Sequence, residues 1–206
     1  MSAPHRTIAP GSPSARFLAA WVGANLAGGF VVGFLENNGL QFMATLILTG
    51  AIVGSLQWCV LRVVLSRGGG LRWWPLASAL GWIVSALLRS LMQGLYAPVV
   101  NGLWQTFGFW EVFWLNLVTG PLMIWGMAIA QGLILRRRGL SLWGWVVLSL
   151  VGGALQGAAS AALCAGYCPI LPPLWAGGIV AGFGWAVYGL VTGLWLVGRS
   201  FAQETV

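Results

Sequence analysis

The stretch RWWPLASALGWIVSALLRSLMQGLYAP, residues 72–98, decides the fold class. It is long and apolar enough to cross a bilayer, yet Arg89 lies well inside it. Polar or amphipathic side chains recur through the stretch in steps of four and three, which places them on one face of a helix. These residues are Ser78, Trp82, Ser85, Arg89, Gln93 and Tyr96. The stretch therefore predicts a transmembrane helix with one polar face.

Arg89 needs a physical explanation in such a helix. Insertion scales put the cost of an arginine at the centre of a membrane helix at about 3 kcal/mol. At about 1.5 Å per residue from Trp73, Arg89 lies roughly 24 Å along a span of about 30 Å, so its side chain can reach the far surface. Two interpretations stay open: Arg89 snorkels to the surface, or it pairs with an acidic residue inside the protein.

The composition extends this expectation to the whole chain. Of 206 residues, 59% are hydrophobic and 6% are charged, whereas about a quarter of residues are charged in soluble proteins. We therefore expect an all-α integral membrane protein without a separate soluble domain. Apolar runs long enough to span cover residues 17–35, 40–65, 73–96, 113–135, 142–165 and 174–197. They form a transmembrane domain at 17–199, between a disordered or flexible N-terminal tail (1–16) and a short C-terminal tail (200–206).

The arginines predict the orientation of the six spans. Every arginine except Arg89 falls on one side of them, whereas Glu36, Glu111 and the loop between Cys164 and Cys168 fall on the other. Because arginine-rich loops stay in the cytoplasm, both termini are predicted to be cytoplasmic. Tryptophans concentrate toward both ends of the spans, as expected of an interfacial belt.

The residue types that are missing exclude several functions. Lysine and aspartate are absent, and His5 is the only histidine. The spans therefore lack the lysine that a Schiff base needs and the histidines that bind haem or a metal. They also lack a base to activate a serine or cysteine nucleophile. We therefore expect no enzyme activity, no cofactor and no metal. The net charge of +7 comes mostly from arginines at helix ends, so we do not expect nucleic-acid binding.

The outward-going spans share the pattern W-x3-[N/S]-x2-G. It occurs as Trp21-x3-Asn25-x2-Gly28, Trp74-x3-Ser78-x2-Gly81 and Trp145-x3-Ser149-x2-Gly152. A pattern repeated at the same place in successive hairpins indicates an internal repeat. The six spans are therefore predicted to form three helical hairpins around a pseudo-threefold axis along the membrane normal.

The repeat also predicts a polar site near the outer surface. Eight residues beyond the shared glycine lie Glu36, Arg89 and Ser160, which should then sit at the same depth. An ion pair between Glu36 and Arg89 would explain the costly arginine, and Glu111 is the alternative partner. The candidate polar or ion-pair site consists of Arg89, Glu36, Glu111, Gln93, Gln156 and Ser160.

The end of the second span carries a recognisable motif. It reads Gly50-x3-Gly54-x2-Gln57-Trp58-x2-Leu61-Arg62 and is followed by Trp73-Trp74. In this the chain resembles a group of small bacterial polytopic membrane proteins that repeat G-x3-G-x2-Q-W-x2-L-R at inward helix ends. A second copy departs from the motif, with Ala128 and Gly132 in place of Gly and Trp. The resemblance implies a multi-pass protein of the bacterial inner (plasma) membrane, and no particular activity.

Small residues recur four apart in most spans. The pairs are Gly29 with Gly33, Gly50 with Gly54, Gly153 with Gly157, Gly178 with Gly182, and Gly189 with Gly193. Such pairs let membrane helices approach closely, either within the chain or against a partner subunit.

Two further clusters are candidate sites. Arg136, Arg137 and Arg138 serve either to set the topology or to hold anionic lipid head groups. Cys164 and Cys168 are close enough for a disulfide, with two free thiols as the alternative. Their spacing does not fit a zinc or haem motif. The aromatic segment 97–110 is too short to span and is expected to lie along the outer interface, as a lid or a seal.

Three functional hypotheses follow. The first is a non-enzymatic subunit or scaffold of a larger membrane assembly, with membrane lipids and another membrane protein or a second copy as partners. The alternative is a small transporter or channel with a polar site around Arg89, open to the outer face. The third is an intramembrane enzyme that uses Glu36 or Glu111 as acid or base. The first two differ in whether the polar stripes converge on a hydrated cavity.

Overall fold

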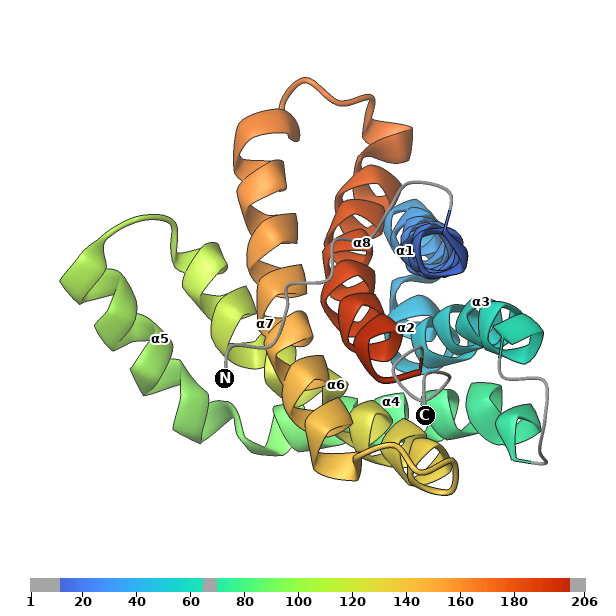
Figure 1. Ribbon diagram of the computed structural model, residues 1–206. Coiled ribbons are helices and arrows are strands. Elements are labelled where there is room, and N and C mark those ends of the chain that lie inside the picture. The colour runs from blue at the N-terminus through green and yellow to red at the C-terminus, as the bar shows by residue number, and fades with distance from the viewer. Residues whose placement is uncertain (1–11, 65–69, 201–206) are drawn as a thin grey trace, which may run out of the picture.

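A computed structural model of the chain describes residues 12–64 and 70–200, and helices make up most of these ranges (Figure 1). The α-helices are α1 (Pro13–Leu35), α2 (Gln41–Met43), α3 (Thr49–Val64), α4 (Trp74–Leu91), α5 (Gln93–Phe107), α6 (Glu111–Arg136), α7 (Leu142–Tyr167) and α8 (Pro173–Ser200). The predicted tails lie largely outside the described residues, except that α1 already begins at Pro13, inside the predicted N-terminal tail.

Within the described residues, six stretches are long and apolar enough to cross a membrane. They are Pro13–Leu40, Ala44–Val63, Leu71–Leu91, Glu111–Arg136, Leu142–Tyr167 and Pro173–Arg199. Each corresponds to one of the predicted apolar runs, so the expectation of an all-helical chain with six membrane-length helices is confirmed.

The third predicted span is shorter than expected. A turn at Met92 (φ −86°, ψ 7°) ends α4 at Leu91, and the chain continues as the separate helix α5. Gly94 and Pro98 follow this turn, and both weaken a continuous helix. The polar face predicted to run through Gln93 and Tyr96 is therefore interrupted at Met92. The aromatic segment 97–110, which was expected along the outer interface as a lid or a seal, is largely helical: residues 97–107 belong to α5.

The six long helices pack as a closed ring in the order α1, α3, α4, α6, α7, α8, with α8 returning to α1. In Figure 1, α1 is seen nearly end-on, α4 crosses the lower part of the view and α7 runs up its centre, so the three helices point in different directions. Helix α5 lies at the edge of the molecule and packs mainly against α6.

The core has two apolar layers. The first joins the starts of α1, α4 and α7 to the ends of α3, α6 and α8, and includes Trp21, Trp74, Trp145, Leu61 and Leu196. Since Arg16, Arg62, Arg136 and Arg199 lie at these same helix ends, we call this the arginine end. The second layer lies further along the helices and includes Val53, Trp82, Ile124, Trp185 and Tyr188. We call the opposite end, where α1 finishes, the Glu36 end.

Glycines let the helices of the ring approach closely. A Cβ atom at Gly81 of α4 would lie 2.6 Å from the Gly126 carbonyl of α6, so only glycine fits there. At every glycine of the five predicted small-x3-small pairs, atoms of another helix lie within 4 Å of the Cβ position. These glycine faces are therefore occupied inside the chain.

Candidate functional site

A polar hollow of about 470 Å³ opens at the Glu36 end between α1, α7 and α8. Its lining residues are Gly33, Glu36, Asn37, Gln41, Gln156, Ser160, Gly177, Val180 and Ala181. Three of the six residues predicted for the polar site, Glu36, Gln156 and Ser160, thus line one cavity. Asn37 and Gln41 were not predicted to belong to it. The signal that could have pointed to them is the run ENNGLQ at 36–41, which follows an apolar span directly and contains a turn glycine.

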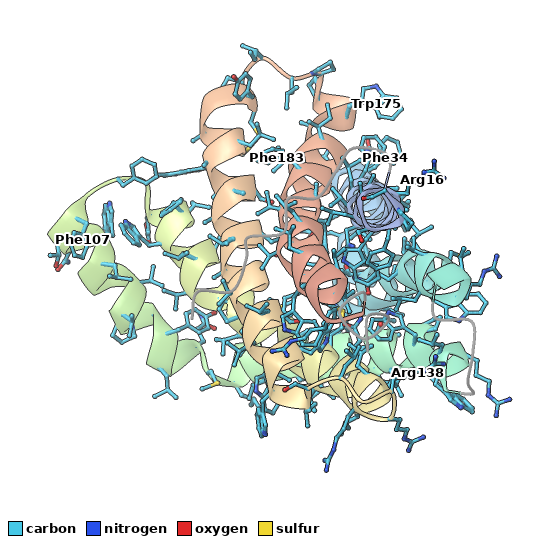
Figure 2. All side chains as sticks on the ribbon, in the orientation of Figure 1. Arg16, Phe34, Phe107, Arg138, Trp175 and Phe183 are labelled. Atoms are coloured by element: carbon cyan, nitrogen blue, oxygen red, sulfur yellow. A yellow bond between two sulfur atoms is a disulfide. The ribbon has the colours of Figure 1, made fainter. Side chains whose placement is uncertain are left out.

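A tight turn after α1 positions Glu36. The turn passes through Gly39, whose φ of +100° favours glycine over other residues. Asn37 Nδ2 donates to the Pro173 carbonyl (2.7 Å) and Asn38 Nδ2 to the Leu174 carbonyl (3.1 Å), so the turn is held on the start of α8. Nearby, Phe34 of α1 lies against Trp175 of α8, as Figure 2 shows, with ring centroids 5.1 Å apart.

Glu36 is half-buried and accepts a hydrogen bond from Thr45 Oγ1 (2.5 Å). It is the only formally charged residue among those that line the hollow. Asn37, Gln41 and Gln156 add amides, and Ser160 adds a hydroxyl whose Oγ donates to the Val180 carbonyl (3.2 Å). One carboxylate surrounded by amides suits a small cation, an amine or a hydroxylated solute.

The other three predicted residues lie elsewhere. Arg89 is near the end of α4, and its Nε is buried without a hydrogen-bond partner in the described part of the chain. No ion pair from Arg89 to either glutamate is recorded among the described residues, so that pairing stays a prediction. Gln93 is exposed on α5, and Glu111 is exposed in the first turn of α6, where a helix dipole favours a carboxylate.

A buried hydrogen-bond network crosses the arginine end of the core. Trp21, Trp74 and Trp145, the tryptophans of the predicted repeat, meet edge to face with ring centroids 5.9–6.5 Å apart. Gln57 lies beside them and is fully buried. It accepts from Trp74 Nε1 (3.1 Å) and Gln131 Nε2 (3.0 Å), and it donates to Asn25 Oδ1 (2.8 Å).

Besides Arg89 Nε, four buried side-chain atoms have no recorded hydrogen-bond partner in the described part of the chain. Trp145 Nε1, Gln131 Oε1, Ser149 Oγ and Tyr188 Oη are buried and unpaired among the described residues. Each such atom costs about 1–3 kcal/mol when nothing satisfies it. Ser149 belongs to the predicted repeat pattern, but the sequence did not indicate that these atoms would lack partners.

The three consecutive arginines lie at the end of α6, whose last residue is Arg136. Arg136 and Arg137 are exposed, and Arg138 is half-buried. Arg137 lines an apolar crevice of about 320 Å³ at the arginine end, together with Gly70, Trp73, Ala77, Leu133 and Ile134. The guanidinium of Arg72 lies over the Trp73 ring, 5.4 Å from its centroid, beside the same crevice. An apolar slot with a cation at its rim matches the two halves of an anionic lipid.

Cys164 and Cys168 are joined by a disulfide at the end of α7, with Cα atoms 4.6 Å apart. Cys59 is an exposed free thiol on α3. In the described part of the chain, no group of three His, Cys, Asp or Glu residues is placed to hold a metal ion.

Comparison with known proteins adds no assignment: the chain matches no family model, no curated protein and no solved structure.

Proposed function

We propose that the protein is a small transporter of the bacterial inner membrane, and that the polar hollow is its outward-facing solute site. In this proposal the six long helices span the bilayer, the arginine end and both termini are cytoplasmic, and the Glu36 end faces outward. The proposal rests on one observation. Glu36 lies far from Gln156 and Ser160 in the sequence, yet all three line one cavity with Asn37 and Gln41.

The packing beneath the hollow supports a state in which the site is open to the outside and closed toward the arginine end. Gly33 lines the hollow, and Gly29 one turn deeper on α1 packs against Trp185 of α8. Trp185 contacts Trp82 of α4 with ring centroids 5.9 Å apart. Beyond this layer lie the three tryptophans of the arginine end. A solute that reaches Glu36 would therefore need a rearrangement of these layers to cross, as alternating access requires.

The chemistry of the lining suggests the class of solute. A single carboxylate without a recorded arginine partner leaves net negative charge in the hollow, which favours a small cation or a protonated amine. The amides of Asn37, Gln41 and Gln156 can donate and accept, so they suit a solute that also carries hydroxyl or carbonyl groups.

The test is uptake into proteoliposomes from a panel of small amines, cations and polyols. Glu36→Gln removes the charge of the hollow and is expected to abolish uptake of the best substrate. Glu111→Gln is the matched control, because Glu111 is predicted to lie on the same side of the membrane but does not line the hollow. Equal uptake by the wild type and Glu36→Gln, or loss in both variants, would remove the hollow from consideration as the solute site.

A second candidate function is that of a subunit in a larger membrane assembly, and α5 is the observation that favours it. Of the residues of α5, only Val100 is buried, and Phe107, Leu95 and Val99 are exposed. Figure 2 shows Phe107 at the outlying end of α5. A helix with so little of its surface packed is available to another membrane protein or a second copy. Mild detergent extraction should then recover a complex, and a monodisperse monomer would count against this role.

The predicted internal repeat is part of the same proposal. It is supported by the mutual contacts of Trp21, Trp74 and Trp145 and by the alternation of outward and inward helices around the ring. A pseudo-threefold bundle places the outer ends of α1, α4 and α7 around one axis, and the hollow uses two of these ends.

A further inference from the structure

Thr45 connects the carboxylate of the hollow to a buried tryptophan of α4. Its Oγ1 donates to Glu36 Oε1 (2.5 Å), and its carbonyl accepts from Trp82 Nε1 (2.5 Å). The two partners belong to different parts of the ring, since Glu36 follows the end of α1 and Trp82 lies in the middle of α4. One residue therefore holds a group of the hollow with its side chain and a group of the core with its main chain.

The backbone around Thr45 is irregular. Residues Ala44–Leu48 lie between α2 and α3 and form a short π-helix, which packs against α4. Thr49 Oγ1, at the start of α3, donates to the Ala44 carbonyl (2.7 Å). Short π-helical turns are rare and frequently lie at functional sites. Thr45 therefore lies in an irregular turn that is fixed at its first residue and faces α4.

The Thr45 hydroxyl has a different kind of partner from most hydroxyls of the long helices. Four of those donate to the carbonyl four residues earlier in their own helix, as is common for serine and threonine. They belong to Ser78, Ser85, Thr119 and Thr192. Thr45 donates to a carboxylate instead. Because a hydrogen bond to a charged acceptor is roughly twice as strong as one between neutral groups, the strength of this bond depends on the charge of Glu36.

Trp82 lies in the layer that closes the hollow toward the arginine end. It is buried, and a Cβ at Gly50 of α3 would lie 2.6 Å from its own Cβ. Its ring contacts Trp185 of α8 with centroids 5.9 Å apart, and Trp185 packs against Gly29 of α1. Four helices therefore meet at these two rings. Since an indole has a single N–H donor, the bond to the Thr45 carbonyl fixes how the Trp82 ring is turned within this layer.

We infer that Thr45 is a positioning residue that couples the charge of the Glu36 carboxylate to the Trp82–Trp185 layer. A cationic solute in the hollow neutralises the carboxylate and so weakens the bond that it accepts from Thr45. Thr45 then moves, and its carbonyl carries the movement to Trp82 Nε1 and to the ring that contacts Trp185. Occupancy of the hollow thereby loosens the layer that closes it toward the arginine end.

As a step in transport, this coupling rests on the proposed function, but the connection itself can be measured without any solute. The probe is the 19F NMR spectrum of protein labelled with 5-fluorotryptophan, in which Trp82→Phe and Trp185→Phe assign the two signals. Glu36→Gln removes the charge of the carboxylate with little change of shape, and it is expected to shift the Trp82 signal. In the absence of the Thr45 hydroxyl, the same substitution should leave that signal in place.

Two substitutions at Thr45 make the comparison. Thr45→Val keeps the shape of the side chain but removes the hydroxyl, so it should abolish the effect of Glu36→Gln on Trp82, and Thr45→Ser should restore it. Glu111→Gln is the matched control, because Glu111 does not line the hollow, and it should leave the Trp82 signal unshifted. An equal Trp82 shift with and without the Thr45 hydroxyl would mean that the charge acts through space, and would overturn the inference. So would the absence of any shift.

A second route applies if Thr45→Val does not fold. Trp82→Phe keeps an aromatic ring but removes the N–H that bonds to Thr45, so Glu36→Gln should then no longer shift the Trp185 signal. A Trp185 shift as large as in the protein with Trp82 would overturn the inference. The outcome is separate from that of the uptake assay. Coupling in a protein that takes up no solute of the panel would contradict the proposed function alone, and uptake without coupling would contradict this inference alone.

Discussion

At the scale of single residues, the polar side chains of the protein divide into two groups with different surroundings. Glu36, Gln156 and Ser160 lie at one end, in a hollow of about 470 Å³. Asn25, Gln57 and Gln131 are fully buried near the other end, where each bonds to protein. The first group lines a cavity, whereas the second forms hydrogen bonds between helices.

Gln57 is expected to be the most sensitive of the buried polar residues, because it joins three helices besides its own. Gln57→Leu would leave Asn25 Oδ1 without the donor it has now and Trp74 Nε1 without its acceptor. At about 1–3 kcal/mol for each of these two unsatisfied groups, the expected loss is about 2–6 kcal/mol. Thermal unfolding in detergent measures it. Gln105→Leu is the control: Gln105 is exposed on α5, and its one recorded bond, to Asn101, is long (3.4 Å), so its melting temperature should hardly change.

At the scale of helices, close backbone contacts determine how the ring closes. Gly81 and Gly126 face each other where α4 crosses α6, and Gly120 and Gly153 do so where α6 crosses α7. Such contacts have no room for a side chain, so they set the distance between helix axes. Helix α5 has no such crossing, since the Cβ positions of Gly94 and Gly102 have no neighbour within 4 Å.

Gly81→Ala is expected to destabilise the protein. Its Cβ would meet backbone atoms of Gly126 and Met127 at 2.6 Å, and backbone cannot move aside as a flexible side chain can. Gly23→Ala on α1 is the matched control, because nothing lies within 4 Å of its Cβ position and alanine favours a helix by about 1 kcal/mol over glycine. The melting temperature should therefore fall for Gly81→Ala and rise for Gly23→Ala. A Gly81→Ala protein as stable as the wild type would contradict the crossing.

The end of α7 gives a covalent prediction. Because Cys164 and Cys168 are bonded, a thiol reagent added to the denatured, unreduced protein should modify Cys59 alone. After reduction it should modify all three cysteines of the chain. Intact-mass measurement counts the added groups. Three modifications before reduction would show that the disulfide does not form in the cell.

At the scale of the whole molecule, charge separates the two ends of the bundle. Arginines close the helices at one end, and both described glutamates lie toward the other. In our proposal this asymmetry orients the protein in the membrane and brings the crevice at Arg137 to the level of the inner-leaflet head groups.

Arg137→Gln is expected to reduce the retention of anionic phospholipid. A basic residue near the head groups contributes about 1 kcal/mol to such binding, which corresponds to roughly a fivefold loss of affinity. The measurement is native mass spectrometry of protein in detergent micelles that contain both phosphatidylglycerol and phosphatidylcholine, which reports how much phosphatidylglycerol stays bound. Arg199→Gln removes the same charge at the same end, away from the crevice, and should keep the lipid. Equal retention by both variants would exclude the crevice as a lipid site.

The sequence by itself determined the helices. Apolar runs of about 20 residues with almost no charge have one stable form in a membrane, because every backbone polar group must be bonded within the helix. This local requirement accounts for the agreement at all six long helices. It also accounts for the misplaced end of α4, since the apolar pattern continues through Met92 into α5 and does not show the turn between the two helices.

Only the tertiary structure decided which polar residues meet. Register placed Glu36, Arg89 and Ser160 at one depth, but depth does not say which helix faces share a cavity. The ring brings Glu36, after the end of α1, into the same hollow as Gln156 and Ser160 of α7, because α8 closes back onto α1. Arg89 lies outside this hollow. The physical reason is that side-chain proximity depends on helix order and crossing, which glycine contacts between distant segments set and which no local pattern records.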